Sequence, residues 1–185
     1  DDVAVEDSSY TTGRRGVAAT VIVEKIVGSL AETGGSLKEC KILGDKVNRN
    51  SGSMGVAFSS CTVPAAGKPT FKLGPDEMEF GVGIHGEPGR RRDKVQSAQK
   101  ITNELLGAII EDLKLENNGE ILLLVNGMGG TPLTELYLLY DNAKKILDNK
   151  NIKIARSLVG NYCTSLEMQG ASLTITKLDQ ELKKH

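Results

Sequence analysis

The sequence predicts an α/β fold in which helices flank a parallel or mixed β-sheet. Two observations carry this prediction. Residues 121–125, ILLLV, form an apolar run with the length of a buried strand, and the pattern of residues 132–148 and then of 152–159 predicts a helix and a further strand. A strand, a helix and a strand in succession are typical of a βαβ unit, in which the two strands are parallel.

The chain begins Asp-Asp-Val-Ala-Val, without methionine. Val3 and Val5 resemble the exposed end of a strand that pairs with another segment, so we interpret the chain as a fragment of a longer protein. Loss of the preceding part would leave apolar surface uncovered around Val3, Val5 and residues 17–30.

Two helices are expected next. Residues 17–30 carry a mostly apolar stripe at nearly helical spacing. Residues 36–48 are expected to form the second helix, because Ser36 and Glu39 have the spacing of a capping box. The polar residues NRNSGS at 48–53 are interpreted as a linker or domain boundary.

The rest of the chain alternates between strands and helices. Hydrophobic patterning predicts strands at residues 54–60, 77–84, 120–126, 152–159 and 171–178. Helices are predicted at 94–113 and 132–148, the second with Thr131 as N-cap and Pro132 at its first position. Free N–H groups in the preceding NGMGGTPLTEL are suited to a phosphate, although a tight strand-to-helix turn explains the same residues.

Composition limits the classes of function. A formal net charge of −1 is unfavourable for broad electrostatic binding to nucleic acid or to an anionic membrane, and no apolar run approaches the length of a membrane span. The three cysteines are far apart and lack Cys-x-x-Cys spacing, which disfavours a disulfide framework and the usual kind of zinc site. A cytoplasmic location is therefore expected.

The stretch EFGVGIHGEPG, residues 79–89, allows two interpretations. Three of its glycines match the dinucleotide-binding pattern G-x-G-x-x-G, which needs a strand before the glycines and a helix directly after them. The strand is expected because apolar residues alternate over 78–84, but the Pro-Gly pair at 88–89 favours a turn where the helix should begin. The pattern is therefore a weak indication of dinucleotide binding.

The same alternation places Gly81, Gly83 and His85 on one face of the expected strand. Two glycines there would leave a shallow bay with an imidazole at its end, where a small ligand approaches the backbone. Neutral imidazole suits nucleophilic or acid–base chemistry near neutral pH. A structural histidine beside glycines that admit a neighbouring element explains the pattern equally well.

Two nearby segments are less informative. Arg90, Arg91, Arg92 and Lys94 form a basic run that is usually solvated surface, but beside a ligand bay such a run favours an anionic partner or a phosphorylated product. CTVPAAGKPT contains a Gly-Lys pair but lacks the earlier P-loop glycine, and Pro69 replaces the Ser or Thr that would bind Mg²⁺. It is not a Walker motif.

Five segments together resemble the dihydroxyacetone-binding subunit of dihydroxyacetone kinase, the DhaK family. They are DDVAVEDSSYTTGRRGVAAT, CTVPAAGKP, EMEFGVGIHGEPG, NGMGGTPLTELY and GNYCTSLEMQGASLTITKLD. They occur in the order of the family and span nearly the whole chain, which makes them far more specific than a short glycine pattern.

The resemblance implies that His85 attacks the ketone carbon of dihydroxyacetone and holds it as a covalent hemiaminal, while Gly81 and Gly83 make room for this substrate. It implies no cofactor on this chain, because ADP or ATP with Mg²⁺ is held by a partner DhaL-type subunit or a fused domain. Nothing similar to that domain follows Leu178, so the bacterial phosphotransferase-system type is expected. A homodimer is expected as well. Residues 1–50 would end a first α/β domain, and residues 51–185 would form a second.

Two further hypotheses remain open at this point. The family's upstream half, with a second histidine and an aspartate used in acid–base chemistry, does not occur in these residues, so the chain alone is expected to be inactive. A non-catalytic coactivator that senses dihydroxyacetone through His85 and binds a transcription regulator is compatible with the same residues. A nucleotide-binding oxidoreductase is a third hypothesis, which predicts affinity for NAD.

Overall fold

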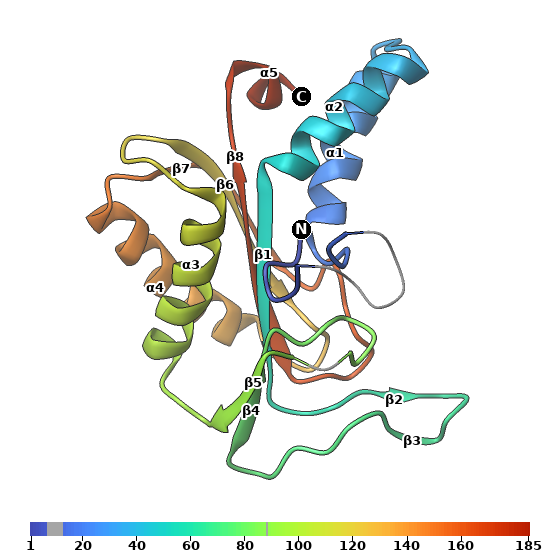
Figure 1. The fold of residues 1–185 in the computed structure, drawn as a ribbon, viewed down its shortest axis with the longest axis vertical. Coiled ribbons are helices and arrows are strands. Elements are labelled where there is room, and N and C mark those ends of the chain that lie inside the picture. The colour runs from blue at the N-terminus through green and yellow to red at the C-terminus, as the bar shows by residue number, and fades with distance from the viewer. Residues whose placement is uncertain (7–12, 88) are drawn as a thin grey trace.

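The computed structural model describes residues 1–6, 13–87 and 89–185, and a six-stranded sheet forms its centre (Figure 1). Strands β6 and β7 run parallel, whereas the other neighbouring pairs are antiparallel. The predicted α/β class with a mixed sheet is confirmed. The strand order is β5-β4-β1-β8-β6-β7, with bounds Ser51–Ala57 (β1), Glu77–Phe80 (β4), Arg91–Lys94 (β5), Glu120–Gly127 (β6), Lys153–Gly160 (β7) and Gly170–Lys177 (β8).

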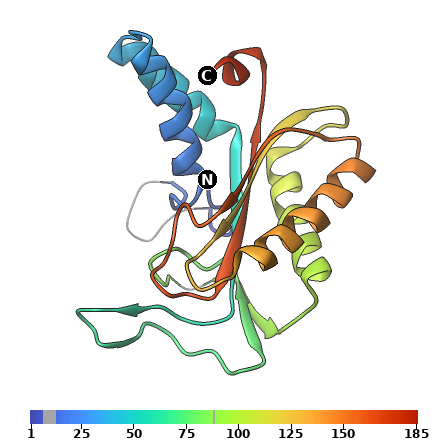
Figure 2. The same cartoon turned by 180° about the vertical axis from the view of Figure 1, so that it is seen from behind.

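Helices lie on both sides of this sheet. Their bounds are Ala19–Glu32 (α1), Leu37–Arg49 (α2), Ala98–Leu113 (α3), Leu133–Asn149 (α4) and Gln180–Lys184 (α5). Figures 1 and 2 show α3 and α4 against one face, whereas the α1–α2 hairpin lies on the opposite side and points away from the sheet at its far end. A small hairpin of β2 (Thr62–Val63) and β3 (Lys68–Pro69) projects from the other end of the molecule. No described helix is both long and apolar enough to span a membrane.

Strand β6 is buried on both faces, which explains its unbroken apolar sequence. Leu123 and Val125 point into the main core beneath α3 and α4, whereas Leu124 packs with Ile22 and Val47 of the α1–α2 hairpin. A strand with both faces buried needs apolar side chains at successive positions rather than at alternate ones. The single run therefore supports both layers of helices.

The predicted βαβ unit is present as β6, α4 and β7. The buried residues of α4 are Leu136, Leu139, Ala143 and Leu147, a spacing that forms one apolar stripe on a helix. The capping box of α2 is also confirmed, because the Ser36 hydroxyl accepts the Glu39 amide N–H and the Glu39 carboxylate accepts the Ser36 amide N–H.

The interpretation of residues 48–53 as a linker is wrong. Helix α2 runs to Arg49 and β1 begins at Ser51, so β1 is displaced by three residues from the predicted 54–60. Within this segment Ser51 and Ser53 are buried, and their hydroxyls are paired across the sheet: Ser51 lies 2.8 Å from Thr176, and Ser53 lies 2.7 Å from Thr174.

The first residues of the chain are part of the same core. The amide of Val3 donates to the Ser53 carbonyl over 2.9 Å, and the Ser53 amide donates to the Asp1 carbonyl over 2.8 Å. Val3 is buried in the main core, as Val17 and Ile22 are elsewhere in the interior. The expectation of uncovered apolar surface around Val3 is therefore wrong. Residues 7–12 of the N-terminal motif and Pro88 of the expected turn lie outside the described residues.

Two segments differ from the predicted helices. Residues 91–94 form the edge strand β5, antiparallel to β4, and Ser97 caps α3 at Ala98, so this helix does not begin at 94. The predicted capping role of Thr131 is also wrong, since Pro132 occupies the N-cap of α4. Thr131 instead uses its hydroxyl on β8, where it donates to the Gly170 carbonyl over 2.8 Å and accepts the Gly170 amide over 2.9 Å.

Substitution of Thr131 by valine is expected to lower the free energy of unfolding by about 2 kcal/mol, because the buried Gly170 amide loses its acceptor, although the Gly170 carbonyl still accepts the Met128 amide. Chemical denaturation of the two proteins measures this difference. Thr134→Val, on the exposed side of α4, is the matched control and should change stability by less than about 0.5 kcal/mol. Equal effects of the two substitutions would contradict the role assigned to Thr131.

Candidate functional site

His85 lies in a loop that follows β4, and we refer to residues 81–87 and 89–90 as the His85 loop. The strand ends at Phe80, four residues earlier than predicted, because Gly81 has a φ of +75° and turns the chain out of the sheet. The Gly81 amide still donates to Gly55, and the Arg90 amide donates to Phe80 to close the loop, each over 2.7 Å. The loop leaves the sheet on the side away from α3 and α4 (Figures 1 and 2).

The predicted open bay over Gly81 and Gly83 is wrong. A Cβ atom at Gly81 would lie 2.6 Å from the Ala4 Cβ, and one at Gly83 would lie 2.2 Å from the Glu87 Oε2. The protein's own atoms therefore occupy the space that the missing side chains leave. These glycines allow the N-terminal segment and the Glu87 carboxylate to approach the backbone closely.

The His85 imidazole projects outward and has an acidic neighbour. Its side chain is 77% exposed, and its Nδ1 lies 3.1 Å from Oε1 of Glu87. The other carboxylate oxygen, Oε2, accepts the backbone N–H of His85 over 2.9 Å. Among the described residues, none hydrogen-bonds to Nε2, which faces outward with its lone pair or proton accessible to a ligand.

The local contacts keep Glu87 ionised near neutral pH. Burial acts to raise the pKa of Glu87, but hydrogen bonds from the backbone amides of Glu87 and His85, and from the His85 imidazole, outweigh it. The net result is a pKa below the usual value of this carboxyl group. An ionised carboxylate thus faces Nδ1 throughout the pH range in which histidine is a good nucleophile.

A buried ion pair anchors the start of the His85 loop. Arg15 lies 2.8 Å from the carboxylate of Asp2, whose side chain is 2% exposed, and the same guanidinium donates to the Gly81 carbonyl over 2.6 Å. Burial raises the pKa of Asp2, although hydrogen bonds from the Ala4 amide and from Arg15 oppose this shift. The N-terminal segment therefore fixes the point at which the chain leaves β4.

Substitution of Arg15 by alanine is expected to reduce the free energy of unfolding by about 3 kcal/mol, because it leaves the Asp2 carboxylate buried without its cation. Denaturant midpoints measure the effect. Lys41→Ala is the control, since Lys41 pairs with Asp45 at an exposed position and such a pair contributes under about 0.5 kcal/mol. A loss of stability no larger than the control's would contradict the anchoring role.

Two of the four basic residues beside the loop, Arg91 and Arg92, are paired with acidic side chains. The Arg91 guanidinium lies 2.5 Å from Glu104 and 5.0 Å from the centre of the Phe80 ring, and Arg92 lies 3.1 Å from Glu79. Glu79 also accepts the Gly89 amide over 2.8 Å. These arginines brace the edge strand and the loop, which reduces the positive charge that they offer to an anion.

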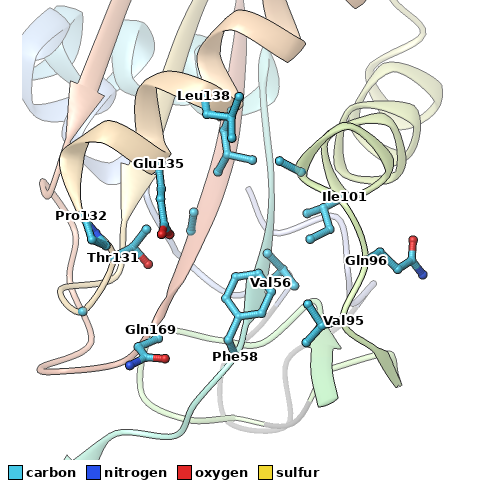
Figure 3. A pocket seen from close by; sticks show the side chains of 14 residues that line it. Val56, Phe58, Val95, Gln96, Ile101, Thr131, Pro132, Glu135, Leu138 and Gln169 are labelled. Carbon is cyan, nitrogen blue, oxygen red and sulfur yellow. The ribbon is translucent and has the colours of Figure 1, made fainter. Parts of the chain in front are cut away.

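A cavity of about 570 Å³ is the second candidate, and it lies between the sheet and the first turns of α3 and α4 (Figure 3). Its walls are mostly apolar, and Glu135 is the one titratable side chain among its described lining residues. His85 does not line it. The cavity is therefore separate from the histidine of the first candidate site. The apolar walls come from Val56, Phe58, Val95, Ile101, Leu138 and Leu139, and polar groups come from Gln96, Thr131, Glu135 and Gln169.

The described residues contain no group of three or more His, Cys, Asp and Glu side chains arranged to hold a metal ion. The first candidate site consists of His85 and Glu87. Glu87 and Arg15 were not identified from the sequence. The signal for Glu87 was its position two residues after His85 in a glycine-rich turn, whereas Arg15 lies 66 residues from the Gly81 carbonyl that it contacts.

Comparison with known proteins gives consistent results. A family described as the Dak1 domain matches residues 1–185. The chain is 51% identical over 181 residues to the dihydroxyacetone-binding subunit DhaK of PTS-dependent dihydroxyacetone kinase 1 from Listeria innocua, which covers 98% of this chain and 55% of that protein. The chain therefore spans about half the length of this relative.

Two solved structures are similar over the whole chain. The dihydroxyacetone kinase operon co-activator DhaQ superposes with a TM-score of 0.90 at 34% identity, and 57% of its chain is covered. The dihydroxyacetone kinase of C. freundii, solved in complex with AMP-PNP and Mg²⁺, superposes with a TM-score of 0.79 at 28% identity, and 33% of its chain is covered.

Proposed function

Because the chain belongs to the Dak1 domain family, we propose that it is the His85-bearing part of the dihydroxyacetone-binding subunit of a dihydroxyacetone kinase. The observation that carries this proposal is the outward-facing imidazole of His85 on a loop fixed by Glu87 and Arg15. The 51% identity to a subunit with this function supports it.

In this proposal the Nε2 atom of His85 attacks the ketone carbon of dihydroxyacetone. The nitrogen–carbon bond forms, the carbonyl π bond opens onto oxygen, and that oxygen takes up a proton to give a hemiaminal. A three-carbon substrate offers little contact area, so a reversible covalent bond supplies affinity that packing does not. Gly81 and Gly83 contribute to substrate binding by shaping the backbone of the loop, because a side chain at either position would displace its neighbours.

The phosphoryl group would come from ADP or ATP with Mg²⁺ on a separate DhaL-type subunit. The phosphotransferase-system type is favoured because the Listeria relative at 51% identity is named as PTS-dependent, whereas the kinase solved with AMP-PNP and Mg²⁺ is 28% identical. We further propose a homodimer, in which residues 1–50 end a first domain and residues 51–185 form the second.

Crystals of the complete subunit soaked in dihydroxyacetone test the covalent role. Electron density continuous from the His85 imidazole to a tetrahedral carbon is the expected result. Density for dihydroxyacetone that is clearly separate from the ring would overturn the covalent role while leaving reversible binding in place.

A coactivator that senses dihydroxyacetone is the second candidate, and the TM-score of 0.90 to the operon co-activator favours it. Reconstitution separates the two functions. The complete protein is mixed with a DhaL-type subunit, its phosphodonor and dihydroxyacetone, and dihydroxyacetone phosphate is measured. Product formation supports the kinase subunit, whereas formation of the covalent adduct without turnover supports the coactivator.

A further inference from the structure

The Glu87 carboxylate holds His85 at two points. Its Oε2 accepts the His85 backbone N–H over 2.9 Å, and its Oε1 lies 3.1 Å from the ring Nδ1. The carboxylate is itself three-quarters buried, with 26% of its side chain exposed, whereas the imidazole is 77% exposed. One largely buried acid therefore sets both the backbone and the ring of an otherwise exposed histidine.

This arrangement selects one form of the neutral imidazole. A carboxylate only accepts hydrogen bonds, so the ring nitrogen that faces it must carry the proton. Neutral imidazole has a single N–H, and a proton on Nδ1 leaves the lone pair on the outward-facing Nε2. We propose that Glu87 is a positioning residue that keeps His85 in the Nδ1–H tautomer and thereby makes Nε2 the nucleophile; this inference rests on the covalent role proposed for His85.

The same carboxylate assists as the bond forms. When Nε2 bonds to the ketone carbon, the ring becomes positively charged, and the oxygen of the former carbonyl takes up a proton from solvent. The Nδ1–H group then becomes a charged donor to an ionised acceptor, which is a stronger hydrogen bond than the one in the free protein. The resulting adduct keeps the proton on Nδ1, carries the positive charge on the ring and has a hydroxyl group on the former carbonyl carbon. Glu87 therefore favours this cationic adduct over the free ketone.

Gly83 is required for this placement. A Cβ atom at residue 83 would lie 2.2 Å from the Glu87 Oε2 and 2.8 Å from its carboxyl carbon, so any side chain there would push the carboxylate away from His85. Gly83 is not among the glycines with positive φ, and alanine therefore fits its backbone conformation. Gly83→Ala is thus a way to displace Glu87 without altering its charge.

Glu87→Gln has a more specific expected effect. The backbone N–H of His85 needs an acceptor, so the single oxygen of glutamine should take the place of Oε2. The side-chain NH₂ group then faces Nδ1 and donates to it. The imidazole proton must move to Nε2, and the nucleophilic lone pair is lost from the outward-facing atom.

The test uses the complete subunit and nuclear magnetic resonance. Nitrogen-15 spectra of the His85 ring report which nitrogen carries the proton, and dihydroxyacetone labelled with carbon-13 at its ketone carbon reports the adduct. Wild type should show the Nδ1–H tautomer. Glu87→Gln should show the Nε2–H tautomer and form the adduct on the order of 10- to 100-fold more weakly. Gly83→Ala should weaken adduct formation by a similar factor. Glu77→Gln is the matched control, because Glu77 also accepts a backbone amide, that of Gly74, but does not contact His85.

The outcomes distinguish the positioning role of Glu87 from the covalent role of His85. A wild-type adduct that survives unchanged in Glu87→Gln and Gly83→Ala would overturn the positioning role and leave the proposed function intact. An Nε2–H tautomer in the ligand-free wild type would by itself overturn the positioning role of Glu87. Absence of an adduct in wild type would instead remove the covalent function, and the tautomers of wild type and Glu87→Gln would still decide what Glu87 does.

Discussion

Replacement of His85 by alanine is expected to abolish covalent retention of dihydroxyacetone by the complete subunit. It should also lower kcat/KM of the reconstituted kinase by on the order of 10²- to 10⁴-fold, because the acceptor hydroxyl is no longer held in position for the phosphoryl donor. The carbon-13 signal of the labelled ketone measures the first effect, and formation of dihydroxyacetone phosphate measures the second.

The second histidine supplies the control for this experiment. His185 lies at the end of the chain after α5, away from the His85 loop, and His185→Ala should leave both measurements unchanged. A His85→Ala protein that still forms the adduct would assign the nucleophile to another residue. Normal turnover without an adduct would show that covalent binding is dispensable.

Selectivity between dihydroxyacetone and glycerol tests the role of His85 independently. Glycerol has no carbonyl carbon for Nε2 to attack, so wild type should favour dihydroxyacetone through the covalent bond. In His85→Ala this preference should shrink, because the remaining contacts do not depend on a carbonyl. The comparison distinguishes loss of the covalent step from general damage to the site, which would weaken both ligands alike.

The sequence predicted the layers of the fold where burial dictates the pattern. The apolar run in β6 and the stripe of α4 were recognised because each buried face imposes a period on the residues. Strand β5 was missed because RRDK has no apolar side to detect, and its place at the edge is set by backbone pairing with β4. The start of β1 was missed because Ser51 and Ser53 resemble linker residues in the sequence. In the structure both are buried, with their hydroxyls paired across the sheet.

Prediction of the site had a similar limit. The motif around His85 made that residue the predicted nucleophile, but the expected strand face did not exist because Gly81 takes a left-handed conformation and ends β4 at Phe80. The alternation of apolar residues carries no information about φ. The Arg15 contact with Gly81 was also out of reach, because it joins residues 66 positions apart through a carbonyl oxygen, which every residue has.

Residues 1–185 by themselves are expected not to phosphorylate dihydroxyacetone, even with ATP and Mg²⁺. Phosphoryl transfer needs the acceptor hydroxyl in line with a metal-neutralised donor and a base within hydrogen-bond reach of the hydroxyl proton. The Glu87 carboxylate is already engaged with the backbone and the ring of His85, and the described residues offer no cluster of acidic and histidine side chains for a metal. Loss of a general base alone costs on the order of 10²- to 10⁴-fold in rate.

The assay compares these residues with a full-length subunit under the same conditions. Each is mixed with dihydroxyacetone, ATP and Mg²⁺, and then again with a DhaL-type subunit and its phosphodonor. The 185 residues cover 55% of the Listeria subunit, so we expect turnover only in the mixture that contains the full-length protein. Circular dichroism of the shorter chain checks that it is folded, so that a lack of activity is not caused by unfolding. Turnover by residues 1–185 alone would refute the division of labour proposed here, because donor, acceptor and base would then all have to be held by the fold described above.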